Sequence, residues 1–302
     1  MGTYYAIQFL PSQDCKMEQV EVDSLLATVN ASMSTYQTDS EISRFNHSRS
    51  VTWQAVSPRL LIVVRAAFDV WKQAGGAFDV TVGPIVNLWG FGPAGETSTP
   101  TLQQQRNAQV RVGMDKLEFR AGEIKKNQPD VYIDLSALAK GFAVDVIAAS
   151  FHEQCSNYLV DIGGEVRAHG VNARGIAWRI GVEVPDPASY GAVQRVLELD
   201  AVSVATSGDY RNYRVIDGVR VDHVIDPRSG VPAENMIASA TVIHPLAMRA
   251  DAYATTMMVL GEQAALAFAD QHAIPVLLIV HQAGTGFREV YNEAMKPYLI
   301  DL

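Results

Sequence analysis

The sequence predicts an α+β fold made mainly of antiparallel sheets packed against helices. Two observations support this prediction: the predicted strands of the second half follow one another in hairpin-like runs, and strict strand–helix–strand alternation is absent. The chain has 302 residues, of which 48% are hydrophobic, and this is enough to bury a full core. No low-complexity or Pro/Ser-rich stretch marks a linker, so we expect a single domain over residues 1–302, or two intimately packed halves.

The first half of the chain carries signals for one strand and several helices. Weak alternation predicts a strand over Thr3–Phe9, and apolar residues at helical spacing predict a helix over 16–33. A helix over 58–74 opens with a Ser-Pro start signal and should stop before Gly75-Gly76.

Three further segments of this half carry expectations of their own. A helix is expected over 136–154, with Ser136 as its N-cap. The segment 99–108 is the loosest stretch and is expected to be a surface excursion. Lys125 and Lys126 form the only adjacent basic pair and are expected in a solvated turn.

The second half is richer in strands, and a helix is expected over 247–271. The predicted strands are 157–161, 165–169, 177–184, 193–199, 203–206, 212–216, 220–224 and a buried strand at 274–280.

The net charge of −9 makes non-specific nucleic-acid binding unexpected, because an acidic chain repels the phosphate backbone. An anionic ligand would need a local device such as a metal or a nest of backbone N–H groups. No run approaches the roughly 20 apolar residues of a membrane span. Cys15 and Cys155 are too few for a zinc cluster or a disulfide framework. They could pair or remain buried thiols, so they do not reveal the compartment.

Several segments mix Gly, Asp and small polar residues in ways that a packed core does not require. In chain order they are MSTYQTDSEISRFN, GAFDVTVGP, DLSALAKG, DIGGEV, SGDYRNY, HVIDPRSG and ADAYATTMMVLG. Together they resemble the ApbE-type FAD:protein FMN transferases, over about Met1 to Gly261. Each segment alone is a weak signal, but seven in order are specific.

The resemblance implies a T-fold-like α+β architecture that binds Mg²⁺ and FAD, with FAD as a substrate. The implied reaction moves FMN from FAD to a threonine hydroxyl of an acceptor protein, through a phosphoester link, and releases AMP. Two alternatives stay open: an Mg²⁺-dependent FAD pyrophosphatase giving FMN and AMP, and a non-catalytic FAD-binding protein.

The resemblance also implies a metal site. Asp251 and Thr255 are four residues apart, so on a helix they share one face and one cation can contact both. From spacing alone, a surface Asp and a Thr bonded to its own backbone would be favoured. The family uses this Asp and Thr as metal ligands and adds the backbone carbonyl of Ala137.

Nine residues are implied as contacts of the flavin nucleotide. They are Met1, Tyr36, Ala77, Phe78, Asp79, Asp134, Lys140, Glu165 and Ile225.

Several of these residues have ordinary alternatives. Tyr36 could belong to the core, Lys140 could be an exposed helix lysine, and Asp134 could be a charge at a helix N-terminus. Glu165 follows Gly163-Gly164, which reads as a hairpin turn, and its place near the cofactor rests on the resemblance alone.

His223 is the first candidate for the general base, because a threonine hydroxyl must lose its proton and histidine titrates near neutral pH. Its alternative is a strand histidine that hydrogen-bonds Asp226. Asp209 is the rival base or an orienting partner. The remaining histidines are expected to be surface or core residues: His47, His152, His169, His244, His272 and His281.

The resemblance implies a protein partner and a location. The expected acceptor is a flavin-carrying subunit of a membrane redox complex with a Thr-containing flavinylation motif. Relatives are usually exported and lipid-anchored, so a periplasmic enzyme at the inner membrane is implied, with a cytoplasmic form as the alternative. The chain has no signal segment, and we expect that a signal and lipid anchor were trimmed.

Overall fold

The computed structural model describes residues 2–12, 15–92, 99–152, 154–189, 191–209, 213–216, 219–282, 284 and 286–300. The chain divides into two compact units. Unit 1 comprises Met1–Ala27, Lys140–Arg211 and Asn235–Leu302, and unit 2 comprises Thr28–Ala139 and Asn212–Glu234. Within the described residues, no helix combines the length and the apolar character that crossing a bilayer requires.

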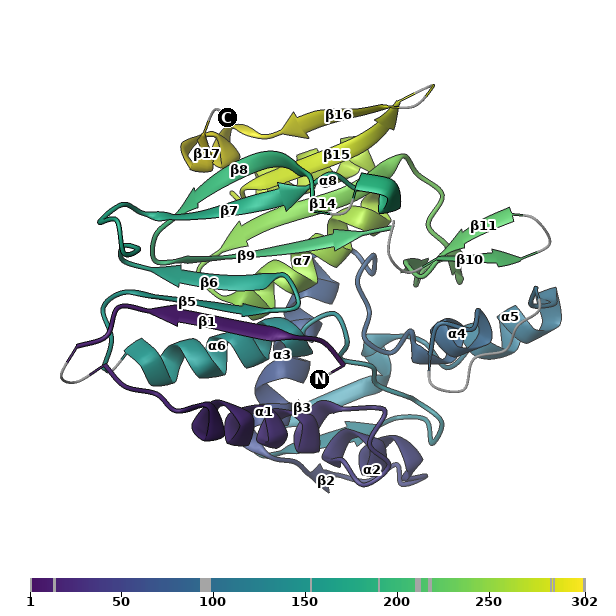
Figure 1. Cartoon of the computed structure of the whole chain (residues 1–302). Coiled ribbons are helices and arrows are strands. Elements are labelled where there is room, and N and C mark those ends of the chain that lie inside the picture. Colours follow the sequence, from purple (N-terminus) through teal and green to yellow (C-terminus); the bar gives the residue numbers. More distant parts are fainter. Residues whose placement is uncertain are drawn as a thin grey trace. The chain divides into compact units, whose positions relative to one another are not determined.

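A seven-stranded sheet forms the centre of unit 1, with the strand order β1-β5-β6-β9-β14-β15-β16 (Figure 1). The bounds are β1 (Tyr5–Phe9), β5 (Tyr158–Ile162), β6 (Glu165–His169), β9 (Val202–Gly208), β14 (Ile237–His244), β15 (Val276–Gln282) and β16 (Gly286–Tyr291). Each neighbouring pair runs antiparallel, so the predicted α+β class with antiparallel sheet is confirmed.

The turn between β5 and β6 is the predicted Gly-Gly hairpin. Ile162 pairs with Glu165 across it, and Gly163 and Gly164 have φ angles of 65° and 100°. A side chain at either position would be strained, which explains why this turn is built from glycine.

A small second sheet covers one face of the large one. It contains β7 (Trp178–Glu183), β8 (Val193–Leu199) and β17 (Leu299–Ile300), in the order β17-β8-β7. Side chains of both sheets, among them Leu197 and Val204, form one apolar cluster. Side chains alternate along a strand, so Ser207 of β9 faces the other way, toward Thr255 of a helix.

Helices α6 (Ala139–His152), α7 (Ala247–Leu260) and α8 (Glu262–Gln271) belong to unit 1. Helix α7 packs against β9 and β14. The prediction of one helix over 247–271 is wrong, because Gly261 has φ 74° and ψ 164°, which ends α7 and begins α8. Two 3-10 turns lie at Pro187–Ser189 and Glu293–Tyr298.

The described residues of unit 2 form four helices and three small sheets. Its helices are α2 (Glu41–His47), α3 (Pro58–Gln73), α4 (Gly83–Leu88) and α5 (Leu102–Gln109), with a 3-10 turn at Met114–Lys116. Its strands are β2 (Gln54–Ala55), β3 (Leu117–Arg120), β4 (Glu123–Lys126), β10 (Tyr213–Ile216), β11 (Val219–Asp222), β12 (Ile225–Asp226) and β13 (Val231–Pro232). Helix α1 (Gln19–Met33) begins in unit 1 and ends in unit 2.

The two expectations for unit 2 have different outcomes. The segment 99–108 is largely exposed, as expected of a surface excursion, and it contains most of α5, which Thr101 and Gln104 start with a capping box. Lys126 does not lie in a solvated turn. It ends β4, is fully buried, and donates to the carbonyl oxygens of Asn46 and Ser48 at 3.3 and 2.9 Å.

Ser136 does not cap a helix, because α6 begins only at Ala139. Its backbone N–H and its hydroxyl both donate to Asp134 Oδ1, at 2.9 and 2.5 Å. The short polar side chain of Asp134 therefore closes a turn before the helix, which is how aspartate competes with helical hydrogen bonding.

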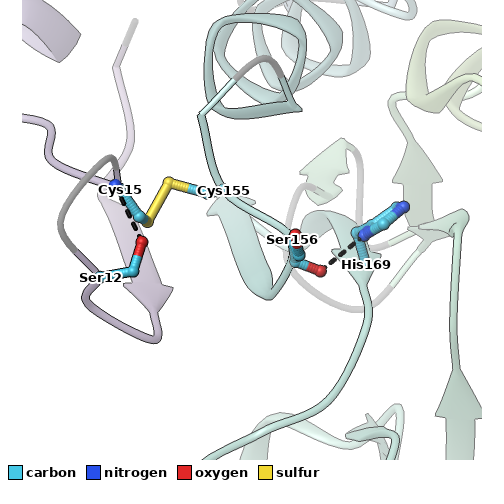
Figure 2. Close-up of a disulfide and its surroundings, with 5 residues drawn as sticks. All are labelled: Ser12, Cys15, Cys155, Ser156 and His169. Carbon is cyan, nitrogen blue, oxygen red and sulfur yellow. Dashed lines mark hydrogen bonds between the residues drawn. A yellow bond between two sulfur atoms is a disulfide. The ribbon is translucent and has the colours of Figure 1, made fainter.

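The structure pairs Cys15 with Cys155 in a disulfide across a sequence separation of 140 residues (Figure 2). Both cysteines are buried. On one side the Cys15 N–H donates to Ser12 Oγ at 3.1 Å, and on the other His169 Nδ1 donates to the Ser156 carbonyl at 2.8 Å. The bond ties the chain after the edge strand β1 to the chain between α6 and β5.

Removing this disulfide is expected to lower the free energy of unfolding by about 2–4 kcal/mol, because a long loop of the unfolded chain gains freedom. Urea unfolding with and without dithiothreitol measures the loss. The Cys15→Ser/Cys155→Ser double variant is the control, since its unfolding should not respond to the reductant. Equal stability of the oxidised and reduced chain would contradict the expectation.

Candidate functional site

Helix α7 carries two oxygen-bearing side chains on one face, Asp251 and Thr255. It belongs to the buried part of unit 1, and only 2% of Asp251 is exposed. Small residues surround it along the helix, which lets α7 lie close to the sheet. A carboxylate in such a place must find hydrogen-bond donors or a cation.

Asp251 finds both at the start of α6. Lys140 Nζ lies 3.4 Å from its Oδ1, and the backbone N–H of Gly141 donates to its Oδ2 at 3.2 Å. The same Lys140 ammonium lies 3.0 Å from Oε1 of Glu165, which is 3% exposed and opens β6. We name Lys140, Glu165 and Asp251 the carboxylate cluster.

Charge is not balanced in the carboxylate cluster, because one lysine serves two carboxylates. Partial burial lowers the pKa of Lys140, but Asp251 and Glu165 outweigh it, so its pKa lies above the usual range. Burial and the nearby Asp251 raise the pKa of Glu165. Glu165 Oε2 is buried without a hydrogen-bond partner among the described residues. The cluster could therefore accept a further cation or proton.

The first turn of α7 is held by Asp145, which sequence reasoning did not identify. Its two carboxylate oxygens accept from the N–H groups of Ala247 and Met248, at 2.8 and 2.9 Å. Burial raises the pKa of Asp145 to about 6, against the opposing effect of these two donors. The sequence signal that could have identified Asp145 is that it is the single acidic residue in the apolar sequence of α6.

Ser207 of β9 and Asp209, which directly follows this strand, each contact another polar side chain of unit 1. Ser207 Oγ lies 3.3 Å from Thr255 Oγ1. Two residues further, the buried Asp209 accepts from His281 Nε2, at 3.2 Å between its Oδ2 and the ring nitrogen. His281 was expected to be an ordinary surface or core residue, so this pairing was missed. The signal was a single histidine directly after the apolar run of β15.

In unit 2 the residues Ala77, Phe78 and Asp79 are buried in the loop that leads to α4. Asp79 Oδ1 accepts from the N–H and hydroxyl of Thr81, at 2.7 and 2.6 Å, and Oδ2 accepts from Met114 N–H at 3.1 Å. Burial raises the pKa of Asp79, opposed by these hydrogen bonds. Asp79 therefore shapes the loop, whatever else it contacts.

The other predicted residues of unit 2 differ widely in exposure. Tyr36 is 71% exposed, so the alternative that places it in the core is wrong. Ile225 is buried in an apolar cluster with Ile85 and Trp89. Ala137 lies in the turn before α6, and Asp134 is not in a first helical turn, since α6 begins five residues later.

His223 lies between β11 and β12 rather than within a strand, and its ring centroid is 6.3 Å from that of Phe91. The nearby Asp226 pairs with Arg228, whose Nε and Nη2 donate to its two oxygens at 2.9 and 2.8 Å. Burial raises the pKa of Asp226, but these bonds outweigh it and lower the pKa. Met1 and residues 210–212 of the predicted motifs lie outside the described residues.

A sequence model of the ApbE family matches residues 1–278 of this chain. The chain belongs to the ApbE family. The resemblance drawn from the seven sequence motifs is thereby confirmed.

Curated relatives and solved structures agree with this membership. The chain is 43% identical to the FAD:protein FMN transferase of Vibrio cholerae, over 99% of this chain and 90% of that protein. It is 38% identical to the FAD:protein FMN transferase of Salmonella typhimurium, over 99% of this chain and 87% of that protein. It superposes on the flavin transferase ApbE from Vibrio cholerae with a TM-score of 0.91 and 42% identity, over 99% of this chain and 96% of the other. It also superposes on the apo form of the flavinyl transferase ApbE from Pseudomonas stutzeri with a TM-score of 0.90 and 34% identity. That match covers 98% of this chain and 93% of the other.

Gly141 is expected to be indispensable to the contact between α6 and α7. A Cβ at this position would lie 2.3 Å from the Ala247 carbonyl oxygen and 2.6 Å from Met248 N. Gly141→Ala should therefore lower the free energy of unfolding by about 1–3 kcal/mol, which urea titration measures. Gly286→Ala is the control, because its Cβ would meet only Gln282 Oε1 at 3.7 Å. Equal stability of the two variants would refute the close approach of the helices.

Proposed function

We propose that this protein is a Mg²⁺-dependent FAD:protein FMN transferase, which moves FMN from FAD to a threonine hydroxyl of an acceptor protein and releases AMP. Full-length similarity to curated transferases of this name supports the activity. The observation that carries the proposal within the structure is the carboxylate cluster, in which two buried carboxyl groups share one lysine, with Thr255 one helical turn from Asp251 on α7.

The residues of unit 1 suit a magnesium ion. Mg²⁺ takes hard oxygen ligands, few of them from protein, and keeps positions for water and substrate phosphate. Asp251 and Thr255 supply such oxygens, and the unpartnered Glu165 Oε2 marks a place where positive charge is missing. Among the described residues no three His, Cys, Asp or Glu side chains form a complete metal cage, so substrate and backbone oxygens must contribute. We assign the backbone ligand to Ala137.

When bound, Mg²⁺ neutralises charge on the pyrophosphate oxygens of FAD and on the departing AMP. The chain's own residues have separate tasks. Lys140 holds Asp251 and offers a cation to the substrate phosphates. Asp145 and Gly141 fix the start of α7, so that Asp251 and Thr255 keep one orientation.

The remaining assignments concern the nucleotide and the attacking hydroxyl. The proposed FAD contacts include the exposed ring of Tyr36 and the loop formed by Ala77, Phe78 and Asp79. Further proposed contacts are Asp134, Ile225 and Met1. His223 is proposed to take the proton from the threonine hydroxyl as it attacks the FMN phosphorus. Asp209, oriented by His281, is the alternative base.

We propose that the enzyme works in the periplasm on a flavoprotein subunit of a membrane redox complex, anchored to the inner membrane by a lipid. The Cys15–Cys155 disulfide supports an oxidising compartment, because such bonds persist outside the cytosol.

The direct test incubates the purified chain with FAD, Mg²⁺ and an acceptor that contains a Thr flavinylation segment, and then measures the intact mass of the acceptor. A gain equal to FMN minus water, abolished by EDTA, is expected. Release of free FMN and AMP without that gain would assign an FAD pyrophosphatase instead. Bound FAD with neither product would assign a flavin-binding protein.

Asp251→Ala is expected to reduce FMN transfer by on the order of 100-fold or more, since a metal ligand is lost. Calorimetric titration should show weakened Mg²⁺ binding, while much FAD binding survives through ring contacts. Glu293→Ala removes an exposed carboxylate and serves as the control. Unchanged transfer in Asp251→Ala would remove this residue from the metal site.

His223→Ala is expected to slow transfer by roughly 100- to 10,000-fold with little change in FAD affinity, the usual range for a lost general base. Single-turnover rates and FAD titration separate the two effects. His152→Ala, an exposed histidine, is the control. Loss of FAD binding in His223→Ala would show that this residue supports the fold or the nucleotide instead.

A further inference from the structure

Unit 2 contains a polar pocket that no proposed role explains. Its volume is about 390 Å³, and Asn87, Arg111, Tyr132, His47, Arg49 and Asp130 contribute to its lining. This volume lies within the range of small-molecule sites in proteins. None of the residues proposed above to contact FAD, metal or acceptor hydroxyl lines it. We name it the Arg111 pocket.

Two atoms in the lining lack partners that burial would ordinarily require. Arg111 Nε and Asn87 Oδ1 are both buried, and neither has a hydrogen-bond partner among the described residues. Leaving such atoms unsatisfied is unfavourable, so each calls for an explanation. Asn87 Oδ1 lies against Gly92, where a Cβ would come within 1.8 Å of it, whereas Arg111 Nε is a buried donor without a described acceptor in a residue that lines the pocket.

The charge of the Arg111 pocket is positive, in contrast to the acidic chain. Its lining contains two arginines, Arg49 and Arg111, and a single acidic residue, Asp130. Lys126 is buried near Arg49, and burial together with the charge of Arg49 lowers the pKa of Lys126 to about 8. Concentrated positive charge in a concave, partly desolvated place attracts anions.

The walls of the pocket are fixed before any ligand arrives. Asn87 sits in the last turn of α4, and Arg111 follows α5. The Tyr132 ring lies against Gly83, where a Cβ would come within 2.4 Å of Tyr132 Cδ1. His47 Nδ1 donates to the Ser43 carbonyl at 2.7 Å, which fixes the ring. Preformed walls reduce the ordering cost of binding.

We propose that the Arg111 pocket binds a small organic oxyanion, a carboxylate or phosphate monoester, other than the FAD substrate. The Arg111 guanidinium is its main contact, since Nε and Nη can donate in parallel to two oxygens of one anionic group. The exposed Arg49 adds positive charge to the lining. The Asn87 amide contacts a hydroxyl or a further oxygen of the ligand. This site does not depend on the proposed transferase activity.

The test titrates the full-length chain with inorganic phosphate, with citrate and with AMP at constant ionic strength, and measures the heat of binding. Saturable binding of at least one probe is expected, weakened about tenfold or more in Arg111→Gln. Arg106→Gln is the matched control, because it removes the same charge from an exposed position on α5 and should bind normally. If Arg111→Gln does not fold, Arg49→Gln takes its place, with a smaller expected loss.

Three results would overturn the proposal. The first is the absence of saturable binding of any probe to the unaltered chain. The second is equal loss of affinity in Arg111→Gln and Arg106→Gln, which would show a general charge effect. The third is competition, in which FAD displaces the probe and Arg111→Gln weakens FAD binding equally, since the pocket would then be a subsite of the flavin nucleotide. Normal FMN transfer by Arg111→Gln, with the probe affinity lost, supports a separate site.

Discussion

The burial of the Asp251 carboxylate is the constraint on which the arrangement of unit 1 depends. A buried carboxylate needs charged or hydrogen-bonding partners, and Lys140 and the N–H of Gly141 provide them from the first turn of α6. Both partners reach Asp251 only if α6 and α7 approach closely, and Gly141 permits this because it has no side chain. Asp145, one turn further along α6, then satisfies the free N–H groups at the start of α7.

A second consequence is an imbalance of charge that function can use. Lys140 also serves Glu165, so two buried carboxylates share one ammonium. An arrangement selected for stability alone would pair each charge, since an unpaired buried charge is unfavourable. The magnesium site proposed above would use these two carboxyl groups. In unit 2 the Arg111 pocket shows the opposite imbalance, with two guanidinium groups against one carboxylate.

Local sequence signals predicted the elements whose causes are local. The Ser-Pro start and the Gly75-Gly76 stop correctly bounded α3, and Gly163-Gly164 correctly predicted the β5–β6 hairpin. The strand β14 was missed because it is central and buried on both faces, so its sequence lacks the alternation of a half-buried strand. Helix α5 was not predicted because its sequence is polar and lacks an apolar helical pattern, so its start signal, the capping box of Thr101 and Gln104, was overlooked.

The sequence by itself determined the family, the α+β class and the identity of Asp251 and Thr255 as a pair one helical turn apart, because these follow from ordered motifs and from helix geometry. The tertiary structure alone decided that Glu165 and Lys140 meet Asp251, that His281 contacts Asp209, and that Cys15 pairs with Cys155. These contacts join residues that are distant along the chain. Their distances depend on how strands and helices pack, and no local pattern records that packing.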